Sequence, residues 1–299
     1  MLTKKTVFVL GAGASAPFNF PIGSALSDQI VSQLHPGNGP YNLLQQFSLF
    51  SEREIVFFRE TFFQSGKNSI DAFLEHRSNF MEIGKAAIAA VLIPREQNST
   101  VFSYDSQNWL RYVYNQMSTT FDEFGENQVS FVTFNYDRVV EHFLFTSIMN
   151  SYGKDADACL AVMNRIPVVH LHGRLGYLPW ESPDSRPFAP NLSKESLERC
   201  IKGIKIIHED IKDGRDTEFA LAKQFLREAE QIYFMGFGFN RTNVERLDIA
   251  NLEKRRPIYS TAYNLTDSEK SAILRLTENT VSFQAQDCIG MCREWVNWS

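Results

Sequence analysis

Short stretches rich in β-branched and aromatic residues recur along the chain, and longer stretches with helical patterns separate them. We expect strands at Val7–Leu10, Val129–Phe134, Ile166–Leu171, Gln231–Met235 and Pro257–Tyr263. Helices that cross over between strands make neighbouring strands run parallel, so this alternation favours βαβ units. The sequence therefore predicts an α/β fold with a parallel sheet.

A long block between the first two expected strands, from Tyr41 to about Phe124, has almost only helical patterns. Within it, Ser69 is typical of a helix N-cap, and the helix that it begins is expected to continue to Leu92, before Pro94 ends it. The block is either an insertion into the sheet domain or a small helical subdomain. We predict a sheet domain formed by residues 1–40 and 126–299 and a helical insertion formed by residues 41–125.

The net charge and the length of the apolar runs exclude some classes of protein. Its 299 residues include 30 Lys and Arg against 35 Asp and Glu, a formal net charge of −5. This balance excludes a broadly basic nucleic-acid-binding protein, although it is compatible with a local basic patch. The longest apolar run, Ala86–Ile93, is far shorter than the ~20 residues of a membrane-spanning helix. We expect a soluble, cytoplasmic protein without a membrane partner.

The four cysteines favour reduced thiols over a metal site. Only Cys288 and Cys292 are close in sequence, whereas a structural zinc site usually has two close pairs or a Cys/His set. Reduced cysteines are usual in the cytosol. We therefore expect no bound metal.

A glycine-rich segment, Gly11–Ala16, directly follows the first expected strand. Glycines at its first and third positions allow a tight turn and a close approach of the backbone to a pyrophosphate, which free N–H groups at a helix start favour. Pro17 and Pro21 delay the next helix, and no acidic residue closes a second strand about 20 residues further on, as a standard dinucleotide-binding motif requires. The alternative is a tight turn that binds no ligand.

Two polar segments follow later strands, at the edge of an open α/β sheet where ligands bind. In Thr133–Asp137, the side chains of Asn135 and Asp137 either face a ligand or cap the next helix. In His170–Gly176, His172 ends its strand and can reach a ligand. His170 lies two residues earlier on the same face, and we interpret it as a core histidine.

A second glycine-rich segment, Gly236–Asn240, follows the fourth strand. Gly236 and Gly238 would let the backbone approach a ribose or a phosphate, and a tight turn is the alternative. The stretch Pro179–Pro190 is too rich in proline for a helix or a central strand. It is expected to be a surface loop that either covers a pocket or has no role in the site.

Five segments together resemble, in this order, motifs of the sirtuin-like family, and most closely its bacterial branch in anti-phage defence. They are Gly11–Ser15, Ser69–Leu74, Thr133–Asp137, His170–Gly173 and Gly236–Gly238. The resemblance spans about residues 5 to 265. It implies a Rossmann-like NAD site and cleavage of the bond between nicotinamide and ribose.

The resemblance also implies roles for single residues. It places Asn135 and His172 at the two positions that matter most for cleavage, with Asp137 as a support residue. Together with the loop glycines, the expected NAD contacts are Gly11, Ala12, Gly13, Ser15, Asp137, Gly236 and Gly238.

Two departures from protein-deacylating sirtuins favour NAD hydrolysis. The chain lacks their four-cysteine zinc module, and Pro17–Gly23 contains no arginine where they carry one. The expected activity is therefore that of an NAD glycohydrolase, with NAD as substrate. The alternatives are a non-catalytic module that senses NAD or ADP-ribose, and an NAD-dependent deacylase or ADP-ribosyl transferase.

An unrestrained NAD hydrolase would drain its own cell, so we expect its activity to be gated. The chain shows no separate sensor domain. Gating would then come from homo-oligomerisation or from a partner. The resemblance suggests a ring-forming ATPase translocase or a nucleic-acid-guided protein as that partner.

Overall fold

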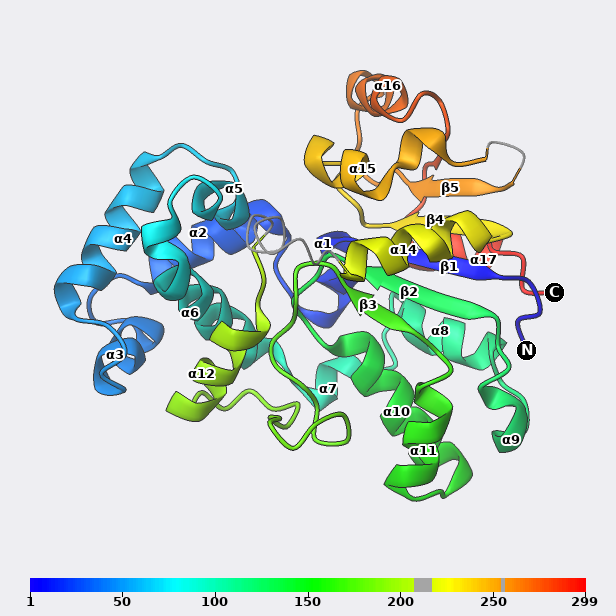
Figure 1. The fold of residues 1–299 in the computed structure, drawn as a ribbon, viewed down its shortest axis with the longest axis horizontal. Coiled ribbons are helices and arrows are strands. Elements are labelled where there is room, and N and C mark those ends of the chain that lie inside the picture. Colours follow the sequence, from blue (N-terminus) through cyan, green and yellow to red (C-terminus); the bar gives the residue numbers. More distant parts are fainter. Residues whose placement is uncertain (207–216, 254–255) are drawn as a thin grey trace.

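The computed structural model describes residues 1–206, 217–253 and 256–299, and this part of the chain contains one parallel sheet of six strands. The strands are β1 (Thr6–Leu10), β2 (Val129–Thr133), β3 (Val168–His170), β4 (Gln231–Met235), β5 (Ile258–Thr261) and β6 (Ser282–Gln284). Their order, β3-β2-β1-β4-β5-β6, is that of a Rossmann-like fold, and Figure 1 labels the first five of these strands from β3 to β5. The predicted α/β fold is confirmed. The strand β6 was not predicted, because three partly exposed residues carry no recognisable pattern.

The strands β1, β2 and β4 are aligned at their carboxyl ends. Leu10 pairs with Thr133 on one side and with Met235 on the other. The segments that follow these strands therefore begin side by side. The strand order reverses between β1 and β4, and such a switch point is where open α/β sheets bind ligands.

Nine α-helices of the described residues come before β2, and those from α3 onward coincide with the predicted helical block of residues 41–125. They are α1 (Ala12–Ser15), α2 (Gly23–Gln33), α3 (Gly39–Gln46), α4 (Glu52–Gln64), α5 (Ile70–Leu74), α6 (Met81–Leu92), α7 (Asn98–Val101), α8 (Trp109–Gln116) and α9 (Phe121–Phe124). Short 3-10 turns occur at Ala16–Phe18, Ser78–Phe80 and Ile93–Arg95. Figure 1 shows α2 to α6 grouped beyond the carboxyl ends of the strands.

The helices after β2 mainly cover the two faces of the sheet. They are α10 (Val139–Tyr152), α11 (Ala156–Met163), α12 (Lys194–Gly203), α14 (Thr217–Glu228), α15 (Arg241–Leu247), α16 (Asp267–Leu276) and α17 (Cys288–Glu294). A further 3-10 turn occurs at Ile249–Asn251. None of the helices in the described ranges is both long and apolar enough to cross a membrane.

The helix expected from Ser69 to Leu92 is broken, and that prediction was wrong. Ser69 does cap α5, but α5 ends at Leu74, and α6 begins only at Met81. A Cβ on Gly84 would lie 2.6 Å from the side chain of Leu74, so the glycine lets the two helices pack closely. Tertiary packing therefore prevails over the continuous helical pattern.

The alternating side chains of β1 enter two separate cores. Phe8 and Leu10 belong to a large apolar cluster that also includes residues of α2, α6 and α8. Val7 and Val9 belong to a smaller cluster on the opposite face of the sheet, against α14 and α15. Because successive side chains of a strand point to opposite faces, one buried strand joins both layers. The helical block thus shares a core with one face of the sheet.

Candidate functional site

The two glycine segments contact each other directly at the switch point. The amide of Gly13 donates to the carbonyl of Gly236 at 3.0 Å. A Cβ on Gly11 would lie 2.5 Å from the carbonyl oxygen of Gly236. Gly236 has a φ of +59°, and a Cβ there would lie 2.2 Å from the amide nitrogen of Ala14. These three glycines are therefore required by backbone packing, whatever ligand the loops bind.

A pocket of about 920 Å³ opens beside this contact, at the carboxyl ends of β1, β4 and β5. Its size is within the range of about 300–1,000 Å³ that is usual for small-molecule and cofactor sites. Of the predicted contacts, Ala12, Gly13, Gly236 and Gly238 line it, whereas Gly11, Ser15 and Asp137 do not. Further lining residues that were not predicted include Ile22, Gln107, Thr261, Tyr263, Asn264 and Asp287.

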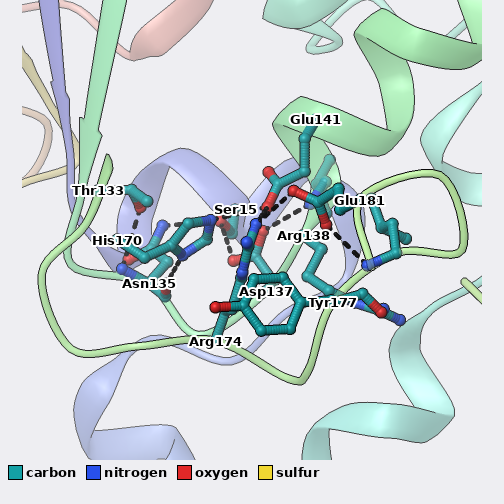
Figure 2. A network of polar contacts seen from close by, with 12 residues as sticks. Ser15, Thr133, Asn135, Asp137, Arg138, Glu141, His170, Arg174, Tyr177 and Glu181 are labelled. Atoms are coloured by element: carbon teal, nitrogen blue, oxygen red, sulfur yellow. Dashed lines mark hydrogen bonds and ion pairs between the residues drawn. The ribbon is translucent and has the colours of Figure 1, made fainter. Parts of the chain in front are cut away.

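Asn135, Ser15 and Asp137 form a chain of hydrogen bonds next to the pocket (Figure 2). The side-chain amide of Asn135 donates to the carbonyl of Gly11 at 2.9 Å and to the hydroxyl of Ser15 at 2.8 Å. The hydroxyl of Ser15 donates to Asp137 at 2.6 Å. Both hydrogens of the Asn135 amide thus hold the loop after β1. Its oxygen, Oδ1, has no hydrogen-bond partner within the described residues, so it can face a ligand.

Asp137 is a buried carboxyl group at the end of this chain. Burial raises its pKa to about 6, although the hydrogen bonds from Ser15 and from the Val139 amide lower it. Above that pH the ionised carboxylate accepts the hydrogen bond from the Ser15 hydroxyl, and below it the protonated acid is a weaker acceptor. Asp137 therefore supports Ser15 and Asn135 and does not line the pocket.

His172 is buried, with 6% of its surface exposed, and its Nε2 has no hydrogen-bond partner among the residues described. Its ring packs edge-on against Phe134, with centroids 5.3 Å apart. Burial lowers the pKa of His172. The nearby carboxylate of Asp71 raises it and the nearby charge of Arg246 lowers it further, and the net effect is a lowered pKa. The imidazole is therefore neutral at physiological pH. An unpaired buried nitrogen is rare in proteins, so this atom is a candidate for contact with a substrate.

Asp71 joins the helical block to this site and was missed as a site residue. It lies in the first turn of α5, and its carboxylate accepts a hydrogen bond from the hydroxyl of Tyr136. Tyr136 belongs to the segment that carries Asn135, and its ring lies 6.4 Å from that of His172. In the sequence, an acidic residue in a first helical turn is explained by the helix dipole alone. Its place in the Ser69–Leu74 motif was the only available signal.

His170 is buried and hydrogen-bonded, as expected of a core histidine, and its partners belong to a network of charged groups (Figure 2). Its Nε2 lies 2.7 Å from Oε1 of Glu141, and its Nδ1 lies 3.1 Å from the carbonyl oxygen of Asn135. Arg174 pairs with Glu181 at 2.7 Å and with Glu141 at 3.5 Å. Burial raises the pKa of Glu141, but the charge and hydrogen bond of His170, with the charge of Arg174, lower it to about 2.

The free energy of unfolding in acid should depend on the ion pairs that Glu141 makes in this network. Glu141 has a pKa of about 2 in the folded protein against an ordinary 4.5, so the stability it contributes is complete above pH 4.5 and is lost as the pH falls towards 2. The loss is on the order of 3 kcal/mol.

Urea unfolding between pH 2 and 6 should show that the free energy of unfolding falls less steeply in acid for Glu141→Gln than for wild type. Asp137 acts in the opposite sense, because its raised pKa weakens the fold as the pH rises from 3.8 to about 6. If the free energy of unfolding of wild type and of Glu141→Gln fell equally steeply with pH, the role of Glu141 would be contradicted.

The proline-rich stretch 179–190 is held by a second buried network. Arg138 donates to Glu96 at 2.7 Å and to the carbonyl oxygens of Arg186 and Pro187. Arg186 lies 2.7 Å from the same carboxylate of Glu96. The stretch contributes no residue to the wall of the 920 Å³ pocket. It reaches the network around His170 through Glu181.

Metal-ligating residues do not gather in the part of the chain that the structure describes. No group of three or more His, Cys, Asp or Glu side chains there could hold a metal ion. The four cysteines are buried and free. Burial raises the pKa of Cys288, which lines the pocket, to about 12 and keeps its thiol protonated.

Comparison with models of protein families finds no match to this chain, and a search of curated proteins finds no match either.

Proposed function

We propose that this protein is an NAD hydrolase that cleaves the bond between nicotinamide and ribose and releases nicotinamide and ADP-ribose. The observation that carries the proposal is the buried, unpartnered Nε2 of His172, beside the segment of Asn135 at the carboxyl end of a Rossmann-like sheet. The pocket of about 920 Å³ at the switch point is large enough for a dinucleotide. The resemblance of five motifs to the sirtuin-like family supports the same activity.

The cleavage needs few groups. Breaking the bond develops positive charge on the ribose, as in glycoside cleavage, and nicotinamide leaves as a neutral molecule without an acid. Oδ1 of Asn135 would accept a hydrogen bond from a ribose hydroxyl or from the attacking water. Nε2 of His172 would accept a proton from that water or hydroxyl, a task that requires the neutral imidazole which burial favours.

One observation favours a second candidate function, a non-catalytic module that senses NAD or ADP-ribose. Neither Asn135 nor His172 lines the large pocket; the ring of Phe134 packs against His172 on one side and, at 5.0 Å, against Phe237, which lines the pocket. Hydrolysis requires the nicotinamide end of the substrate to reach Asn135 and His172 from this pocket. A sensor requires only that the pocket bind the dinucleotide.

Gating of the activity belongs to the same proposal. A cytoplasmic NAD hydrolase must be restrained, and homo-oligomerisation or a partner would provide the restraint. The resemblance to the defence branch suggests a ring-forming ATPase translocase or a nucleic-acid-guided protein as the partner. Full activity of a dilute, monomeric preparation would argue against gating.

Incubation of the purified protein with NAD, followed by mass spectrometry of the products, tests the function. We expect nicotinamide and free ADP-ribose. Cyclic ADP-ribose would indicate cyclisation, and a modified protein would indicate deacylase or transferase chemistry. Binding of ADP-ribose without any turnover, across protein concentrations and candidate partners, would favour the sensor. The absence of both binding and turnover would exclude the proposed NAD site.

A further inference from the structure

His170 lies between two groups that can only accept hydrogen bonds. Its Nδ1 lies 3.1 Å from the carbonyl oxygen of Asn135, and its Nε2 lies 2.7 Å from Oε1 of Glu141. A backbone carbonyl never donates, and neither does an ionised carboxylate. A neutral imidazole carries one N–H and can satisfy only one of the two. Both contacts are satisfied together when each ring nitrogen bears a proton.

Burial keeps water away from the contact between His170 and Glu141, while the contact between His170 and the Asn135 carbonyl is partly buried. The side chains of His170 and Glu141 are 6% and 3% exposed. An imidazole nitrogen facing a carboxylate oxygen at 2.7 Å without a proton between them would be repelled, and the repulsion would be strong in a buried site. The 2.7 Å contact therefore requires a proton between Nε2 of His170 and Oε1 of Glu141. The contact with the Asn135 carbonyl requires a second proton, on Nδ1.

We propose that Glu141 holds His170 as an imidazolium cation at neutral pH, and that this cation is a positioning residue for Asn135. The protonation state rests on the contacts of His170 alone. Its effect on catalysis rests on the proposed NAD hydrolysis.

The charged groups around His170 and Glu141 favour a protonated His170. Arg174 faces Glu141 from the segment after β3, and Glu181 faces Arg174 from the proline-rich stretch. With His170 protonated, the charges of His170 and Arg174 offset those of Glu141 and Glu181. Asp137, at the start of the helix that carries Glu141, is a further acidic group that interacts with both members of the pair. A neutral His170 would leave the buried carboxylates in excess.

The imidazolium acts on Asn135 through the main chain. The amide of Asn135 donates to the hydroxyl of Thr133 at 3.0 Å, and the carbonyl of Tyr136 accepts from the amide of Leu175 at 2.9 Å. The bond from His170 to the Asn135 carbonyl fixes the peptide plane between these two anchors. Without it, the peptide plane loses an anchor, and the main chain of Asn135 can shift while Gly11 and Ser15 still hold the side-chain amide, so Oδ1 would be less precisely aligned with a substrate.

Nitrogen NMR of the full-length protein labelled with ¹⁵N-histidine tests the protonation state directly. The chain has six histidines, and the signal of His170 is identified by its loss in His170→Gln. We expect both ring nitrogens of His170 in the protonated range at pH 7. One nitrogen in the unprotonated range would overturn the proposal, and this readout needs neither a substrate nor a folded Glu141 variant.

Glu141→Gln tests the positioning role. The variant is expected to lose the imidazolium signature of His170 and to lower kcat for NAD by about 10- to 100-fold, with a much smaller change in KM. The matched control is Glu126→Gln, which removes an exposed partner of Arg165 and should change neither. Wild-type kcat in Glu141→Gln would overturn the positioning role. If wild type binds NAD without turnover, the proposed hydrolysis fails, while the NMR result still decides the state of His170.

Discussion

Replacing His172 with alanine is expected to lower NAD hydrolysis by roughly 10²- to 10⁴-fold, the usual contribution of a general base. The imidazole is buried and neutral, and its Nε2 has no partner in the described part of the chain, so its removal leaves no broken hydrogen bond at that atom. The fold should survive, although a small cavity will lower its stability.

Product formation under saturating NAD, measured beside circular dichroism and thermal unfolding, checks this result. His35→Ala is the matched control, because His35 is exposed and lies outside both the pocket and the polar network. Its turnover should equal that of wild type. A folded His172→Ala protein with wild-type turnover would refute the catalytic role of His172.

Replacing Gly238 with leucine is expected to weaken the binding of ADP-ribose by roughly 100-fold or more, which corresponds to about 3 kcal/mol. A Cβ on Gly238 would meet no protein atom within 4 Å, and the residue lines the pocket. The new side chain should therefore fill the ligand's space without disturbing the fold. Gly236 cannot serve this purpose, because any side chain there would collide with the backbone of Gly13 and Ala14.

Calorimetric titration of ADP-ribose into wild type, Gly238→Ala and Gly238→Leu measures this effect. The single methyl group of alanine should cost much less affinity than leucine at the same position. A graded loss with side-chain size, at unchanged thermal stability, would locate the ligand in the pocket. Equal affinity for all three proteins would place the ligand elsewhere.

Much of the fold could be predicted from local patterns. Val7–Leu10 and Gln231–Met235 were recognised because a strand buried on both faces is a short apolar run followed by glycine. The sheet order was not predictable in the same way, because the register between β1 and β4 depends on how crossover helices pack. The break between α5 and α6 also depends on packing, since Leu74 of one helix covers Gly84 of the other.

The candidate site was predictable only in part. The segments of Gly11, Asn135 and His172 were found because each follows a strand, and parallel strands end at one edge of a sheet. Asp71 was missed because it meets Tyr136 across 65 positions of sequence. Glu141 was missed because it looks like an ordinary acidic residue in the first turn of α10.

The amino-acid sequence by itself determined the α/β class and the strand-end segments, because hydrophobic period and glycine placement act over a few neighbouring residues. Only the tertiary structure decided which groups meet: two glycine loops in backbone contact, and a histidine enclosed between a carbonyl and a carboxylate. Such contacts join separate elements, and burial removes the water that would otherwise satisfy each group alone. The protonation and pairing of these side chains are therefore properties of the packed molecule.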